Sequence, residues 1–222
     1  NLARCYLAQG RYKKAIQKAR ETMAKSAEMG DKHYANMAGI VLAESYLTQG
    51  AAEECEETLV AIEEKDPHAD FFVLGNIQRI RGLVAVADHD VELAIHHFSR
   101  ALTIFETAGD IYHTGLIHAL LGANLDERHA ARAKNHLNSA ADIFKKLGLQ
   151  PKLRSIEAEL RRIESVPVPS GSRPIEKRFN SVVSQLLTVR LAEATASREL
   201  LFRELVAILQ QDSNAKKIII AQ

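Results

Sequence analysis

The chain has 222 residues, 46% of them hydrophobic, and a formal net charge of +1 at pH 7. This apolar content is enough for one or two folded units and too high for a disordered chain. The near-zero charge gives no basic field that would recruit nucleic acid or an anionic membrane, and no apolar run is long enough to span a bilayer. Cys5 and Cys55 lie in apolar helical patterns, which favours free buried thiols in a reducing, cytoplasmic compartment.

Residues 1–150 carry a pattern that returns every 39 or 40 residues. The phrase Tyr-Leu-x-Gln-Gly stands at 6–10 and again at 46–50. A small residue follows each short break and precedes an amphipathic run, at Ala15, Cys55, Ala94 and Ala133. Because such a residue lets two helices approach closely, the pattern predicts helix-turn-helix units that stack on one another.

Residues that favour turns fall at the predicted helix ends. Gly10 and Gly50 supply positive φ in the turn inside the first two units, and Asp side chains within 88–90 are expected to form the corresponding turn in the third. Helix-ending residues then close the second helix of each unit: Gly30, Pro67, Gly109 and Gly148.

The combined pattern resembles the tetratricopeptide repeat, whose units share a spaced Leu-Gly-x-x-Tyr … Gly-x-Tyr-x-x-Ala … Ala … Pro signature. The matching residues are Leu2, Ala3, Tyr6, Gly10, Tyr12, Ala15, Leu42, Ala43, Tyr46, Gly50, Pro67, Gly82, Ala94, Phe98, Ala101, Leu120, Ala133, Leu137 and Ala140. The resemblance implies an all-α, right-handed superhelical stack of four units over residues 1–150, the first of them truncated. The period exceeds the family's usual length of about 34 residues, and Arg81 occupies a position where the family usually has Leu.

The resemblance also implies that the first helices of the units line a groove that holds a peptide or a partner helix. By register, the groove residues are Arg4, Leu7, Met37, Ile40, Glu44, Leu47, Asn76, Arg79, Leu83, Val86, Thr114, His118 and Leu125. An alternative within the family is a carboxylate clamp, for which the corresponding positions are Arg4, Val41, Asn76 and Ile80. A groove occupied by the protein's own C-terminal helix fits the pattern as well.

No constellation of reactive residues points to catalysis or to a metal. His96 and His97 are adjacent, so they point to different sides of a helix, and His113 and His118 have poor spacing for shared ligation. The chain has no HExxH, CxxC, GxSxG or phosphate-binding glycine motif. We therefore expect no catalytic residue, metal or cofactor, and a binding protein rather than an enzyme.

Beyond residue 150 the repeat gives way to other segments. Residues 151–164 are predicted to form an amphipathic helix that caps the last unit, and the stretch 165–174, which contains Pro, Ser and Gly, a linker. Residues 175–211 have a long helical pattern whose apolar seam is typical of a coiled coil, formed by Phe179, Val182, Leu186 and Val189. A loop and a short β-branched strand at 212–222 then open a further domain that is cut short.

The stretch 191–222 resembles the connector and opening of a GAF-type sensory domain. In bacterial signalling proteins, tetratricopeptide arrays stand directly before such domains. The two resemblances together imply the partner-sensing segment of a bacterial signal-transduction or transcription regulator. The seam within 175–211 offers a way to form a homodimer, and the near-zero net charge and the lack of a long apolar run lead us to expect no direct contact with nucleic acid or membrane. The alternative is a free-standing adaptor that bridges partners and has no attached output domain.

Overall fold

The computed structural model describes residues 2–125 and 129–165. Within these ranges the fold is all-α, with nine helices and no strand, as predicted. The predicted linker from residue 166 onward, the helix 175–211 with its seam, and the strand within 212–222 lie outside the described residues. The helices are α1 (Leu2–Ala8), α2 (Tyr12–Glu28), α3 (Lys32–Leu47), α4 (Ala52–Lys65), α5 (Phe71–Ala87), α6 (Val91–Thr107), α7 (Ile111–Asn124), α8 (Ala130–Lys146) and α9 (Gln150–Ser165).

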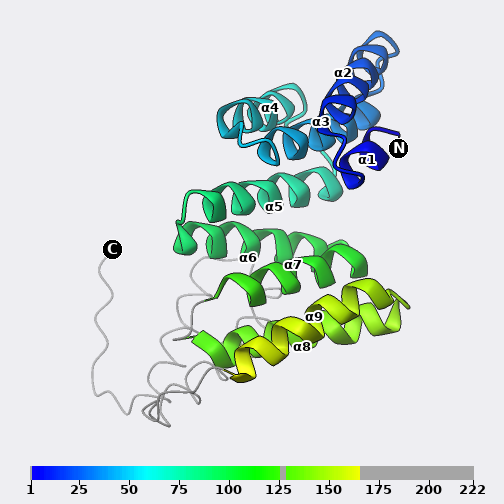
Figure 1. Ribbon diagram of the computed structural model, residues 1–222. Helices are drawn as coiled ribbons and strands as arrows, with labels where there is room; N and C mark the ends of the chain where they lie inside the picture. Colours follow the sequence, from blue (N-terminus) through cyan, green and yellow to red (C-terminus); the bar gives the residue numbers. More distant parts are fainter. Residues whose placement is uncertain (1, 126–128, 166–222) are drawn as a thin grey trace, which may run out of the picture. The chain divides into compact units, whose positions relative to one another are not determined.

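Consecutive helices pack against each other as hairpins joined by short turns (Figure 1). The four hairpins are α1–α2, α3–α4, α5–α6 and α7–α8, and α9 packs on α8. Neighbouring hairpins touch as well, through α2 with α3, α3 with α5, and α6 with α7. We call α1, α3, α5 and α7 the first helices and α2, α4, α6 and α8 the second helices. The arrangement is a stack of helical repeats, which confirms the interpretation of the 39- to 40-residue period.

Glycines on one helix and large side chains on the next bring the third hairpin together. A Cβ added to Gly75 would lie 2.5 Å from the ring of Phe105, and one added to Gly82 would lie 2.4 Å from the ring of Phe98. Both distances are shorter than any van der Waals contact, so α5 and α6 can approach this closely only because the two positions lack a side chain.

The fourth hairpin repeats this packing 40 residues later. A Cβ on Gly115 would lie 2.6 Å from Ile143, and one on Gly122 would lie 2.5 Å from Leu137. Gly82 and Gly122 therefore have the same role, although the sequence signature had matched only Gly82. Gly122 precedes Ala133 by 11 residues, whereas Gly82 precedes Ala94 by 12, so the first helix of the fourth unit is shifted by one position relative to its second helix.

Aspartates begin three of the first helices. Asp31, Asp70 and Asp110 precede α3, α5 and α7, and each side chain accepts a hydrogen bond from the backbone amide three residues later, at 2.9–3.1 Å. These are N-cap bonds, which satisfy amides that have no partner within the helix. Their spacing of 39 and 40 residues gives each repeat the same starting point.

The turn inside the third hairpin differs from the one predicted. Gly10 and Gly50 have φ values of +70° and +77°, as expected for the first two hairpins. In the third, the residue with positive φ is His89, at +60°. Asp90 instead caps α6, because its side chain accepts a hydrogen bond from the amide of Leu93 at 2.9 Å.

The core is divided into clusters that cross from one hairpin to the next, so that neighbouring hairpins share apolar packing. The last cluster joins Leu137, Ala140 and Phe144 of α8 to Ile156 of α9, with Leu153 packed beside them. The helix predicted at 151–164 therefore lies within α9 and covers the apolar side of α8.

Among the described residues, no helix has the length and apolar character needed to cross a membrane.

Candidate partner-binding surface

Two charged residues link neighbouring hairpins through their first helices. Glu44 on α3 accepts two hydrogen bonds from Arg79 on α5, with Oε2 2.7 Å from Nη2 and Oε1 3.2 Å from Nη1. The side chain of Arg79 is only 8% exposed, whereas that of Glu44 is 29% exposed. The carboxylate thus keeps its contact with solvent while it neutralises a buried guanidinium.

Asn76, three residues before Arg79 on α5, holds the guanidinium in place. Its side-chain oxygen accepts a hydrogen bond from Nε of Arg79 at 3.0 Å, and its amide nitrogen donates to the backbone oxygen of Phe72 at 2.9 Å. Asn76 and Arg79 are both buried, and each has hydrogen-bond partners. Because a satisfied polar network in a buried site has few alternative arrangements, it holds one geometry.

Phe72 extends this network to α1 and α7. The guanidinium carbon of Arg4 lies 5.9 Å from the centre of the Phe72 ring, within the range of a cation–π contact. The ring of His113 on α7 meets Phe72 edge to face, with centroids 5.1 Å apart. We call Arg4, Glu44, Phe72, Asn76 and Arg79 the first-helix cluster, since these five residues connect α1, α3 and α5.

His113 anchors the α7 side of this cluster. Its ring stacks on Phe105 with centroids 4.8 Å apart, and its Nδ1 lies 2.7 Å from Oδ2 of Asp110. Burial lowers the pKa of His113 below its usual value, although the hydrogen bond to Asp110 acts in the opposite direction. The neutral imidazole is therefore favoured near pH 7, and the ring serves as an aromatic contact.

The other predicted groove residues are placed in three ways. Ile40 is fully buried in the core of the second hairpin, so its side chain is not accessible to a partner. The hydroxyl of Thr114 donates a hydrogen bond to the backbone oxygen of Asp110 at 2.8 Å. Five partly buried apolar residues lie on the first helices: Leu7, Met37, Leu47, Leu83 and Val86.

His118 and Leu125 do not join the first-helix cluster. His118 points to the second helices, with its Nδ1 2.9 Å from Nδ1 of His136 on α8 and its Nε2 3.9 Å from the carboxylate of Glu106 on α6. Burial lowers the pKa of His118, and burial together with the charge of His118 lowers the pKa of His136 to about 4. Leu125 is the residue that follows the last turn of α7.

The position of His118 has a counterpart one hairpin earlier. Gln78 lies four residues before Gly82, as His118 lies four before Gly122, and its Oε1 is 2.9 Å from Nδ1 of His97 on α6. The first helix therefore directs this position toward the second helix of its own hairpin. The register shift in the fourth unit explains why the groove pattern assigned His118 to the opposite side.

The carboxylate clamp is not formed. Val41, Asn76 and Ile80 are each at most 6% exposed. The side-chain oxygen and nitrogen of Asn76 are already hydrogen-bonded, to Nε of Arg79 and to the backbone oxygen of Phe72. Arg4 is thus the one clamp position that remains open to a carboxylate.

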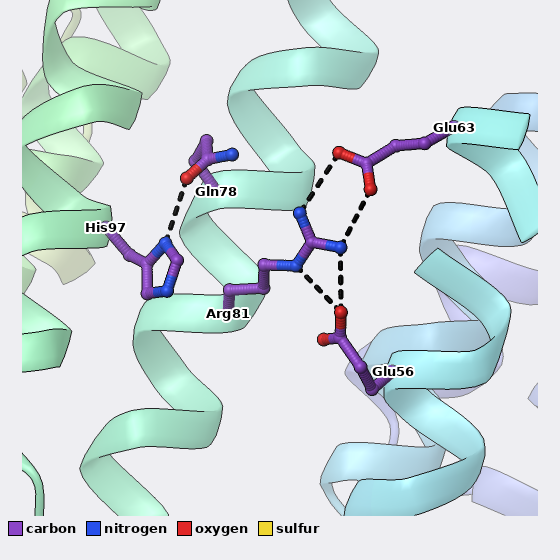
Figure 2. Close-up of polar contacts among 5 residues, drawn as sticks. All are labelled: Glu56, Glu63, Gln78, Arg81 and His97. Atoms are coloured by element: carbon purple, nitrogen blue, oxygen red, sulfur yellow. Dashed lines mark hydrogen bonds and ion pairs between the residues drawn. The ribbon is translucent and has the colours of Figure 1, made fainter. Parts of the chain in front are cut away.

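Arg81, which stands where the repeat family usually has Leu, bridges α5 and α4 (Figure 2). Its Nη2 lies 2.7 Å from Oε1 of Glu56 and 2.8 Å from Oε2 of Glu63. Burial alone would lower the pKa of Arg81, but the hydrogen bonds to the two glutamates raise it above its usual range. The guanidinium therefore stays charged and holds two hairpins together on the side of the second helices.

The sequence pattern missed the partners of these arginines. The period marked Arg79 as a groove residue and Arg81 as a departure from the family, but the ion pairs with Glu44, Glu56 and Glu63 depend on contacts 18–35 residues away. One signal in the sequence could have indicated these ion pairs: the segment that forms α4 carries six glutamates, and the next helix carries two arginines.

Residues 2–125 and 129–165 contain no group of three or more His, Cys, Asp or Glu side chains placed to hold a metal ion. The predicted dimer seam of Phe179, Val182, Leu186 and Val189 lies outside the described residues. No protein-family model matches the chain, and no curated protein matches its sequence.

Proposed function

We propose that this chain is a protein–protein interaction scaffold of the tetratricopeptide type, whose first helices bind a peptide or helix of a partner protein. The observation that carries the proposal is the first-helix cluster. Its buried Asn76–Arg79 network fixes the surface, while Arg4 and Glu44 keep their polar groups open to solvent. A surface that is already ordered loses little conformational entropy when it binds.

Apolar and charged groups on the first helices complement this fixed surface. Leu83 and Val86 follow Arg79 on α5, and Leu47 follows Glu44 on α3, so partly buried apolar side chains continue from the charged pair along both helices. An amphipathic helix or an extended peptide offers the matching alternation of apolar and polar side chains. This match supports a protein ligand rather than a small-molecule substrate.

The finer proposal is that the chain is the partner-sensing segment of a cytoplasmic bacterial signal-transduction or transcription regulator. It rests on the resemblance of 191–222 to the opening of a GAF domain, which would connect the solenoid to an output domain through 175–211. The alternative is a free-standing adaptor. Sedimentation of the full chain beside a truncation ending at Ile163 separates them: dimerisation of the longer chain alone supports the regulator, and two monomers favour the adaptor.

Selection of peptides displayed on phage against the full chain tests the scaffold function. The selected peptides are then measured by fluorescence anisotropy against Arg4→Glu, which reverses one charge of the first-helix cluster, and against Lys25→Glu on the exposed side of α2 as the matched control. We expect Arg4→Glu to weaken binding at least fivefold and Lys25→Glu less than twofold. Equal affinity for both variants, or no selected peptide, contradicts binding at this surface.

A further inference from the structure

A shallow surface cavity of about 320 Å³, mostly open to solvent, lies where the turn that joins α1 to α2 meets the turn that follows α3. This site is separate from the first-helix cluster, and none of the predicted groove residues lines it. Its lining consists of Gly10, Arg11, Tyr12, Lys13, Lys14 and Gln49. The volume is at the lower end of the range for ligand-binding pockets, so it suits a single side chain or a small group.

Three of the six lining residues are cationic, and the part of the chain that the structure describes gives none of them a salt bridge. By contrast, the buried guanidinium of Arg79 and the partly buried one of Arg81 are both neutralised by glutamates. Like charges that share a cavity repel each other, and an anion that enters the cavity removes this repulsion.

The aromatic ring of Tyr6 orders two of these cations. The guanidinium of Arg11 lies 5.1 Å from the ring centre and the ammonium group of Lys14 lies 6.0 Å from it. Cation–π contacts restrict both side chains without neutralising their charge. The side-chain amide of Gln49 adds an uncharged hydrogen-bond donor to the same cavity.

We propose that this cavity binds the anionic group of an acidic side chain, a carboxylate or a phosphate ester, on a peptide of a partner protein. Ordered cations with no internal counter-charge form charge-assisted hydrogen bonds to such a group. The cavity lies at the turns that follow α1 and α3 and at the first turn of α2.

The surroundings favour a peptide over a nucleic acid. Helix α4 begins three residues after Gln49 and carries Glu53 and Glu54 in its first turn. These carboxylates repel an extended polyanion, whose charges are spaced along its whole length, more strongly than a single anionic side chain, whose charge the three closer cations outweigh. The site goes beyond the proposed function, because it does not require binding at the first-helix cluster.

Fluorescence anisotropy with the full chain tests the site. The probes are fluorescein-labelled peptides that contain four glutamates or two phosphoserines, and a single-stranded DNA of equal charge. The test variant combines Arg11→Gln, Lys13→Gln and Lys14→Gln. The control combines Lys25→Gln, Lys32→Gln and Arg154→Gln, which removes the same charge from exposed positions outside the cavity. Circular dichroism melting of both variants verifies the fold, and single substitutions replace a triple variant that does not fold.

We expect the test variant to weaken peptide binding about tenfold or more and the control less than threefold, since three charge-assisted contacts are lost only in the first. Preference for one peptide identifies the carboxylate or the phosphate ester as the anionic group. Equal loss in both variants, absence of peptide binding at millimolar concentration, or tighter binding of the DNA overturns the proposal. Arg4 does not line this cavity, so Arg4→Glu is expected to leave the binding of these anionic probes unchanged. This result distinguishes binding at the cavity from binding at the first-helix cluster, and failure of one proposal leaves the other testable.

Discussion

Arg79 of α5 and Glu44 of α3 form a two-point ion pair across the boundary between two hairpins, with N–O distances of 2.7 and 3.2 Å. The pair is asymmetric, since the guanidinium is buried and the carboxylate is partly open to water. Removal of the carboxylate leaves a charge inside the protein, whereas removal of the arginine leaves a carboxylate that water can solvate.

Glu44→Ala is therefore expected to lower the free energy of unfolding by about 2–3 kcal/mol, below the full cost of a deeply buried pair because the site is partly solvated. The double variant Glu44→Leu with Arg79→Met removes both charges and recovers most of this loss. Urea denaturation of Glu44→Leu, Arg79→Met and the double variant measures the coupling. Additive effects of the two substitutions would show that the pair does not act as a unit.

Arg81→Leu introduces the residue that the resemblance to the tetratricopeptide repeat leads us to expect at this position. Glu56 and Glu63 are 43% and 37% exposed, so water can solvate both carboxylates once the guanidinium is gone. We expect a change within about 1 kcal/mol in the free energy of unfolding. A loss above about 3 kcal/mol in urea denaturation contradicts this expectation and would make the bridge essential to the α4–α5 contact.

Gly82→Ala tests the close approach of α5 to α6. In an ordinary helix this substitution stabilises by about 0.5–1 kcal/mol, because alanine loses less backbone entropy than glycine. Here the new Cβ would meet the ring of Phe98 at 2.4 Å, so we expect destabilisation of about 1–3 kcal/mol. Thermal denaturation gives the sign directly, and a higher melting temperature for the variant contradicts the packing.

The buried histidines make the fold sensitive to acid. The unfolded chain binds a proton on His136 near pH 6.5, but burial lowers the pKa in the folded protein to about 4. The unfolded state therefore binds more protons in this window, and stability decreases as the pH falls from about 6.5 to about 4. Screening by solvent reduces the effect of this one residue to about 1–2 kcal/mol.

His136→Gln checks that assignment, because glutamine does not titrate in this range. Urea denaturation of both proteins at pH 7 and pH 5 should show a smaller loss of stability in the variant. Equal losses would assign the acid sensitivity to other groups, such as His97, His113 and His118, whose pKa values burial also lowers.

The helical stack was predictable because its signals are local and periodic. Glycine turns, N-cap aspartates and small residues recur every 39 or 40 residues, and each specifies a short stretch of backbone. The register of the fourth unit was not predictable in the same way. Its first helix lies 40 residues after that of the third unit but its second helix lies only 39 after, so a uniform 39-residue period missed Gly122 and placed His118 on the wrong side of α7.

The candidate surface was predictable only in part. The period identified Glu44, Asn76 and Arg79 as residues of one surface, because helical spacing decides which residues share a face. Their hydrogen bonds were not predictable, since a contact between α3 and α5 depends on how two hairpins pack. Phe72 and His113 were not predicted as part of this surface for the same reason, because an aromatic residue at a helix start has many possible neighbours until the fold is known.

The glycine contacts of α5 with α6 lie inside one hairpin, whereas Arg79 and Arg81 make their ion pairs between hairpins. The two kinds of contact respond differently to dissolved ions, because salt screens charges but leaves apolar packing intact. Apolar clusters also cross these boundaries, as where Ile40 of α3 and Leu59 of α4 pack with Ile77 of α5, so salt weakens only the charged part of the contact between repeats. The joints between repeats therefore keep most of their strength in concentrated electrolyte, because apolar packing crosses them and the guanidinium of Arg79 is shielded from dissolved ions.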